Sequence, residues 1–154
     1  MLDDEKFMGE AIAEAERGRA AGELPYGSVL VDEVGQIIGR SFDTVAGDGD
    51  PTCHAEFKVA RQTYLARGAS LAGYTMYSNV EPCAMCFGSA WYTGVSRVVY
   101  GLSMFELIQV QPESMEEVLG PCRELNATLA RQVEIVSGVL HDECLALWCR
   151  AGAV

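Results

Sequence analysis

The feature that most restricts the fold is a pair of short segments, Cys53-His54-Ala55-Glu56 and Glu81-Pro82-Cys83-Ala84-Met85-Cys86. One imidazole and two thiolates suit Zn²⁺, and three protein ligands leave the fourth tetrahedral position open. Each segment begins an expected helix. Cys83 and Cys86 then lie on one face of a first turn, where the positive end of the helix favours thiolate. The fold must therefore bring two helix N-termini to one ion.

Glu56 lies two residues after the expected ligand His54, close enough to reach a water at the open position without coordinating the ion. Zinc lowers the pKa of such a water from about 15.7 to near 7. Glu56 would take its proton and return it to the substrate, first to a ring nitrogen and then to the leaving amine. The residues predict a hydrolytic site with Glu56 as its catalytic residue.

The same residues have simpler interpretations. His54, Cys83 and Cys86 could form a structural zinc site or be buried side chains, and Glu56 could be an acid favoured by the helix dipole. A structural site would normally need a fourth protein ligand. Cys53 is the available candidate, but adjacent residues rarely point at the same ion, which favours a catalytic site.

Apolar spacing and turn residues predict the order of elements. A loop rich in Gly and Asp is expected over 43–52, and a short helix over 113–118. The remaining elements are a helix from Asp4 to about Ala20, strands 28–32 and 36–39 joined as a hairpin, a helix from His54 to about Arg67, a strand over 75–80, a helix over 83–92, strands 97–100 and 133–136, and a last helix from His141 to about Arg150. This alternation predicts a three-layer α/β domain with a mixed sheet.

Length and charge narrow the class of protein. The 154 residues predict one domain, 1–154, and the formal charge of −11 disfavours nucleic acid as a partner. No apolar run approaches the roughly 18 residues of a membrane span, and the acidic start is unlike a signal peptide, so we expect a cytoplasmic protein. Unevenly spaced cysteines in that reducing compartment favour ligands over disulfides, with Cys122, Cys144 and Cys149 expected in the core.

The pair His-x-Glu and Pro-Cys-x-x-Cys is the signature of zinc nucleobase deaminases. The chain resembles the cytidine and deoxycytidylate deaminase superfamily. With Pro25-Tyr26-Gly27, the two segments look like the branch holding bacterial guanine deaminases and tRNA adenosine deaminases. The resemblance implies an α/β/α cytidine deaminase-like fold with a five-stranded mixed sheet, one Zn²⁺ per subunit and a homodimer.

The resemblance also implies where substrate would bind. It places Tyr26 and the region of Trp91 near the pocket, where a flat heterocycle needs flat walls, although either ring could be a core aromatic. Ala55, between the ligand and the acid, is counted with these substrate-binding residues. Relatives usually carry an Asn eleven residues before the zinc His, and this chain has Asp43. An ionised Asp only accepts hydrogen bonds, so Asp43 would prefer a ring that presents N–H or hydroxyl donors, unless it merely caps a turn.

Two further assignments stay open. Guanine deaminases place an acid after the fourth strand to help hold or protonate the base, and the candidates here are Glu106, Glu113, Glu116 and Glu117. His141, at the start of the last helix, would be solvated, cap that helix or contact the site.

The sequence predicts a zinc-dependent aminohydrolase that converts a small amino-substituted heterocycle to its oxo form and releases ammonia. Guanine is the first substrate expected, followed by isocytosine, cytosine or an aminotriazine, and neither a membrane nor a nucleic acid is an expected partner. The alternative within this chemistry is a tRNA adenosine deaminase. The alternative of another class is a non-catalytic zinc-binding subunit, against which the intact Glu56 argues.

Overall fold

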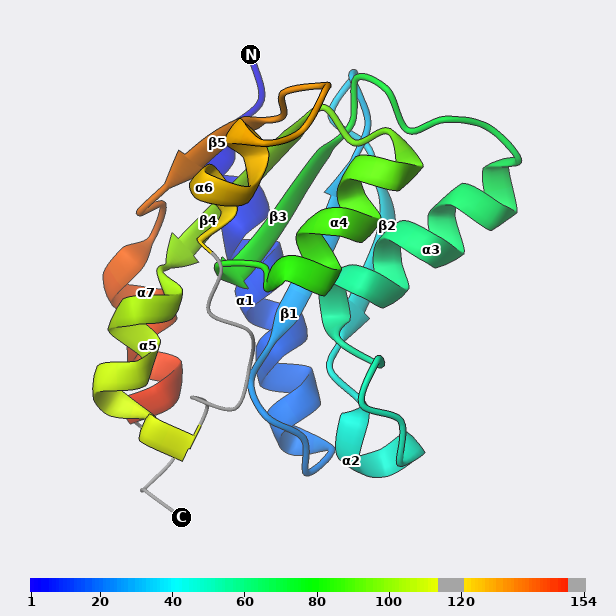
Figure 1. Cartoon of the computed structure of the whole chain (residues 1–154). Coiled ribbons are helices and arrows are strands. Elements are labelled where there is room, and N and C mark those ends of the chain that lie inside the picture. The colour runs from blue at the N-terminus through cyan, green and yellow to red at the C-terminus, as the bar shows by residue number, and fades with distance from the viewer. Residues whose placement is uncertain (114–120, 150–154) are drawn as a thin grey trace.

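The computed structural model describes residues 1–113 and 121–149, and a five-stranded sheet lies at its centre (Figure 1). The strand order is β2-β1-β3-β4-β5. β1 pairs antiparallel with both β2 and β3, whereas β3, β4 and β5 run parallel. The strands are β1 (Gly27–Val31), β2 (Ile37–Phe42), β3 (Thr75–Val80), β4 (Arg97–Leu102) and β5 (Glu134–Ser137). The predicted mixed sheet is confirmed.

Helices cover both faces of the sheet, which confirms the three-layer α/β/α architecture (Figure 1). α1 and α7 pack on one face, and α3 and α4 lie side by side on the other. Within the described residues, every helix is too short or too polar to span a lipid bilayer. The helices are α1 (Asp4–Ala20), α2 (Val45–Asp48), α3 (Ala55–Arg67), α4 (Ala84–Thr93), α5 (Met104–Val110), α6 (Cys122–Ala127) and α7 (His141–Cys149).

β3 is buried along its whole length and divides the core into two parts. Tyr77 packs on the α1 side against Phe7, with ring centroids 5.4 Å apart, whereas Met76 belongs to the cluster under α3 and α4. This alternation is expected because successive strand side chains point to opposite faces. β3 is thereby fixed from both sides, and its carboxyl end leads directly to Glu81 and Cys83.

Most elements lie within a few residues of their predicted bounds, but three of the described helices were not predicted. α2 lies inside the expected loop, and α5 and α6 follow β4. The signal for α5 was present in the sequence, because Ser103 and Glu106 form a capping box in which each side chain binds the other's backbone N–H. Of the helix expected over 113–118, residues 114–118 lie outside the described residues.

Candidate metal centre and active site

His54 stands at the N-cap of α3 with extended backbone, so its ring projects from the end of the helix. The preceding turn is held by Asp50, whose Oδ1 accepts hydrogen bonds from the backbone N–H and the hydroxyl of Thr52 at 2.8 and 2.7 Å. The Cys53 carbonyl accepts a further bond from Thr44 N–H at 3.0 Å. The imidazole is therefore fixed by a hydrogen-bonded loop on one side and a helix on the other.

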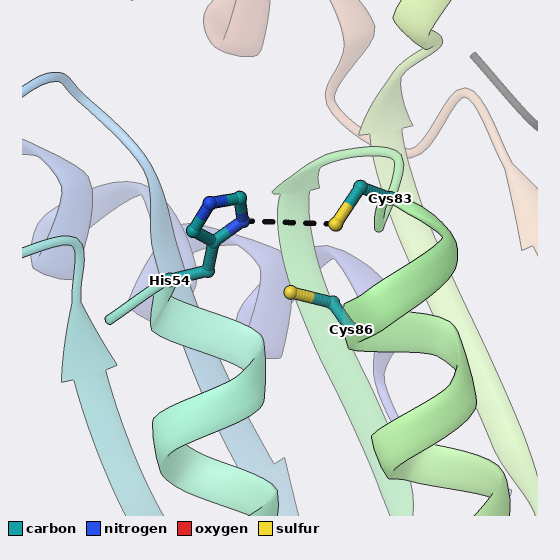
Figure 2. Close-up of side chains that lie close together, drawn as sticks. All are labelled: His54, Cys83 and Cys86. Carbon is teal, nitrogen blue, oxygen red and sulfur yellow. Dashed lines mark hydrogen bonds between the residues drawn. The ribbon is translucent and has the colours of Figure 1, made fainter. Parts of the chain in front are cut away.

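Cys83 occupies the matching N-cap position of α4, and Cys86 follows in the first turn. Figure 2 shows both sulfurs facing the His54 ring from the neighbouring helix. His54 Nδ1 and Cys83 Sγ lie 3.6 Å apart, and the ligand atoms of all three residues lie within 4.8 Å of one another. The predicted convergence of two helix starts is confirmed.

This spacing suits a tetrahedral zinc ion. Bond lengths of about 2.3 Å to sulfur and 2.05 Å to nitrogen place two such ligands about 3.6 Å apart, which matches the His54–Cys83 distance of 3.6 Å. Among residues 1–113 and 121–149 the group contains three ligands, and Cys53 is not one of them. Three soft or borderline donors without a fourth are typical of a catalytic zinc site.

The two thiols respond differently to their surroundings. Hydrogen bonds that the Cys83 sulfur accepts from Cys86 and from His54 lower the pKa of Cys83 to about 4. Burial raises the pKa of Cys86 well above its usual value, and the charge of Cys83 adds to this. Zinc binding would deprotonate both thiols, because cysteine coordinates zinc as thiolate.

Glu56 lies in the first turn of α3 and is only 4% exposed. Its Oε1 accepts a hydrogen bond from Ser78 Oγ at 2.8 Å. Burial, reinforced by the charge of Cys83, raises the pKa of Glu56 to about 7. A carboxyl group that both binds and releases a proton near neutral pH suits general acid and base chemistry, and Glu56 is not among the three grouped ligands.

Comparison with known proteins agrees with this geometry. Residues 1–102 match the family model described as the cytidine and deoxycytidylate deaminase zinc-binding region. The chain belongs to the cytidine and deoxycytidylate deaminase family. It is accordingly a zinc-dependent hydrolytic deaminase, and His54, Cys83 and Cys86 supply a fitting metal site.

Three relatives show how far this likeness extends. The deaminase is 34% identical to a tRNA-specific adenosine deaminase of Haemophilus influenzae, over 92% of this chain and 78% of that protein. It is 31% identical to a probable cytosine deaminase of Schizosaccharomyces pombe, over 92% and 88%. The solved guanine deaminase of Bacillus subtilis superposes with a TM-score of 0.65 at 26% identity, over 95% and 93%.

Asp43 and Tyr26 are joined through their backbones, and Thr44, which follows Asp43, binds the loop that carries His54. Asp43 N–H donates to the Tyr26 carbonyl at 3.1 Å, and Asp43 Oδ1 accepts from Val45 N–H at 3.0 Å. The turn-capping contact weighed above is therefore present. The carboxylate is nonetheless 5% exposed, and burial raises the pKa of Asp43. Ala55 is fully buried at the start of α3.

Trp91 is the predicted substrate residue that the structure does not bring to this group. It lies in the second half of α4, and its indole N–H donates to the Arg131 carbonyl at 2.9 Å. The Arg131 guanidinium stacks on the same ring at 5.6 Å from its centroid. Trp91 lies five residues after Cys86, which is about 7.5 Å farther along the helix axis. Its ring therefore packs against the turn before β5 and does not face the metal ligands.

The acidic candidates divide into two groups. Glu106 and Glu113 are exposed, whereas Glu116 and Glu117 lie outside the described residues. Glu106 Oε1 lies 2.9 Å from His141 Nε2, so these two predicted residues form a pair between α5 and α7.

The cysteines outside the metal group are free thiols. Cys122 and Cys144 are buried as predicted. Cys149 is exposed, so its expected place in the core is wrong. It is the last residue of α7, next to the buried Trp148.

Sequence reasoning gave no role to three buried polar residues at the carboxyl end of β3: Ser78, Asn79 and Glu81. Asn79 donates to the Pro25 carbonyl and accepts from Gly27 N–H, both at 2.8 Å. This fixes the segment carrying Tyr26, whose ring packs edge-on against Trp148 at 4.9 Å. The available signal was a run of polar residues ending a buried strand, where hydrogen-bonding partners are required.

Proposed function

We propose that this deaminase acts on a small amino-substituted nucleobase or related heterocycle, with guanine first, and that residues 1–154 form its single catalytic domain in the cytoplasm. The observation that carries the proposal is the buried Asp43 carboxylate beside the His54 loop. Isocytosine, cytosine and aminotriazines follow guanine in the expected order of substrates.

The proton chemistry is assigned to Glu56. His54, Cys83 and Cys86 would hold the zinc ion, which would supply an activated water at neutral pH. Glu56 accepts a proton from the water and delivers it to the ring nitrogen beside the amino-bearing carbon. The water oxygen bonds to the amino-bearing carbon. As the C–N bond breaks, the same carboxyl group transfers the second proton of that water to the departing amine, so one water is consumed and one ammonia released. Ser78 orients the carboxylate through its 2.8 Å hydrogen bond.

Asp43 is proposed to select the substrate. Its Oδ1 is engaged by Val45 N–H, and within the described residues no hydrogen bond to Oδ2 is present. An ionised carboxylate can only accept, so the free oxygen favours a ring that offers N–H donors. A free purine base has an azole N–H that its nucleoside lacks, which supports guanine over a guanosine or adenosine unit.

Adenosine in tRNA is the second candidate. It is favoured by the Haemophilus influenzae relative, a tRNA-specific adenosine deaminase 34% identical to this chain. Charge opposes it, because the protein carries a formal charge of −11. The cleft beside Cys53 holds two acids, Asp48 and Asp50, against two bases, Lys58 and Arg61. A polyanion would therefore meet no excess of positive charge there.

Steady-state ammonia release tests the two candidates. The substrates compared are guanine, isoguanine, cytosine, isocytosine, an aminotriazine, cytidine, adenosine and adenosine in a tRNA anticodon stem-loop, with Glu56→Gln as the inactive control. We expect turnover of guanine or another free base. No ammonia release from any free base, together with conversion of adenosine in a tRNA anticodon stem-loop, would overturn the proposal.

RNA binding supplies an independent comparison. A polyanion-binding protein loses affinity steeply between about 50 and 200 mM salt. We expect no retention of a tRNA stem-loop by the Glu56→Gln variant at the lower salt. The remaining alternative, a non-catalytic zinc-binding subunit, predicts identical behaviour of wild type and Glu56→Gln in every assay.

We further propose a homodimer that pairs the outer faces of α3 and α4. Tyr92 is 82% exposed and Leu65 60%, beside a hollow of about 550 Å³ lined by the same helices. Phe57 and Met85 line this hollow and also pack against the two thiols. Contiguous apolar surface of this kind is typical of an interface, and a second copy would shield the outer side of the metal group.

Sedimentation tests the assembly. We expect the wild-type chain to sediment as a dimer and Leu65→Asp as a monomer. Val34→Asp is the control, because Val34 is 78% exposed at the turn between β1 and β2, away from this face. A monomeric wild type across the accessible concentrations would contradict the dimer.

A further inference from the structure

Glu81 is a buried carboxylate that the reaction does not use. It is 4% exposed and immediately precedes the Pro82-Cys83 turn. Among the described residues, no Lys, Arg or His forms an ion pair with it; its carboxylate instead accepts hydrogen bonds from two backbone amides. A charge buried without a cation is costly unless hydrogen bonds compensate it, so these amides hold Glu81 in place.

The two amides belong to the first residues of two different helices. Glu81 Oε2 accepts from Met104 N–H at 3.1 Å, at the start of α5. Glu81 Oε1 accepts from Cys122 N–H at 2.8 Å, at the start of α6. The first N–H groups of a helix have no partner within the helix and favour negative charge. One carboxylate therefore satisfies two helix starts that lie 18 residues apart in the sequence.

Both helix starts also touch the metal-binding turn. Met104 is 4% exposed and packs in one buried cluster with Cys83 and Cys86. Cys122 Sγ donates to the Pro82 carbonyl at 3.2 Å. The backbone of Glu81 is fixed as well, since its N–H donates to the Leu102 carbonyl at 2.8 Å. Glu81 thus joins the end of β3, the thiol-bearing turn and the apolar side chain that covers the thiols.

We propose that Glu81 is a positioning residue of the zinc site: its carboxylate holds Met104 against the Cys83–Cys86 pair and holds the start of α6 against the Pro82 turn. Met104 excludes water from the sulfurs, which strengthens their interaction with a cation. The Pro82 turn sets the direction in which the Cβ–Sγ bond of Cys83 points. Loss of the Glu81 carboxylate would loosen the contact of Met104 with the thiols and the contact of α6 with the Pro82 turn, without removing any metal ligand.

Zinc affinity and cobalt spectra test this role. The inference rests on Cys83 and Cys86 being zinc ligands, so the zinc content of the wild type is measured first. Glu81→Gln keeps the size but presents an amide N–H₂ toward one of the two backbone N–H groups. We expect its zinc affinity, measured by competition with a chromogenic chelator, to fall 10- to 100-fold, the usual range for residues that orient metal ligands. The sulfur-to-cobalt charge-transfer bands of the Co²⁺ form should shift.

Asn126→Ala is the matched control. Asn126 is also buried on α6 and makes two backbone hydrogen bonds, to Val133 N–H and carbonyl, at 2.9 and 2.8 Å. Its loss should lower the melting temperature but leave zinc affinity and the cobalt bands unchanged. If Glu81→Gln behaves like Asn126→Ala, Glu81 is merely structural and the proposal is overturned.

A second variant covers the case in which Glu81→Gln does not fold. Met104→Ala retains Glu81 and removes only the side chain that covers the thiols. It should reproduce the shift of the cobalt bands, and an unchanged spectrum and zinc affinity would overturn the proposed route through Met104. A wild type that binds no zinc would instead refute the ligand assignment, which distinguishes failure of the site from failure of this inference.

Discussion

Ser78 Oγ donates a hydrogen bond to Glu56 Oε1 at 2.8 Å, joining the end of β3 to the first turn of α3. Both residues are buried, at 1% and 4% exposure. Because a buried carboxylate needs donors, this contact fixes the rotamer of the proposed proton carrier. Residues 22 positions apart in the chain thereby meet at the reacting group.

Ser78→Ala should lower kcat by about tenfold, equivalent to about 1.4 kcal/mol, because Glu56 loses the donor that orients it.

Glu56→Gln should lower kcat by about 10²- to 10⁴-fold while zinc content stays unchanged. Ammonia release and elemental analysis measure the two quantities.

The control for this pair is Ser28→Ala. Ser28 is a buried serine paired with Ser78 across β1 and β3, but its hydroxyl binds the Tyr77 carbonyl. Its loss should affect stability more than kcat. Equal losses of kcat in Ser28→Ala and Ser78→Ala would contradict an orienting role for Ser78.

Cys86→Ala should abolish stoichiometric zinc binding, because two ligands remain in the group that the fold assembles. Cys144→Ala is the matched control, since Cys144 is equally buried but lies on α7. It should retain one zinc per chain and lose only packing energy. Metal analysis after dialysis decides between them, and zinc retained by Cys86→Ala would exclude Cys86 as a ligand.

Asp43→Asn should change the substrate preference more than the stability. Asn keeps the acceptor for Val45 N–H but adds an N–H₂ group where Asp43 only accepts. We expect kcat/KM for a substrate that offers a ring N–H to fall about tenfold or more relative to one that offers an acceptor. The ratio of kcat/KM across the base panel measures this effect. An unchanged ratio would leave Asp43 as a turn cap.

The His141–Glu106 pair should make stability depend on pH. Hydrogen bonds to Asp142 and Glu106 raise the pKa of His141 above its ordinary value of about 6.5. A raised pKa stabilises the fold fully below about pH 6.5, and this contribution is lost as the pH rises through the pKa of the folded state. The melting-temperature difference between wild type and His141→Asn should therefore be largest near pH 6 and shrink above about pH 8.

Glu106→Gln tests the same pair from α5. This substitution should reduce the pH dependence of stability that His141 causes. Catalysis should be little affected, because Glu106 is exposed and bound to Ser103. Identical melting curves for wild type and His141→Asn at both pH values would show that the pair adds no stability.

The sequence alone was sufficient to predict the fold class and the candidate metal ligands. Alternating short strands and amphipathic segments are local patterns, and they were sufficient to predict α1, β3 and the mixed sheet. The candidate ligands could also be predicted from local patterns. Cys83 and Cys86 share one helical turn, and His54 precedes a recognisable helix. Their metal-binding chemistry can therefore be predicted from each segment separately.

Tertiary structure alone decided which other side chains serve the site. Ser78, Asn79 and Glu81 act through partners 22 to 54 residues away, and no local pattern encodes such pairings. Trp91 shows the converse, because its aromatic character suggested a pocket wall while Arg131, 40 residues on, holds the ring elsewhere. Burial and hydrogen-bond satisfaction are properties of the packed chain, so residue type predicts the chemistry available and packing determines where it is used.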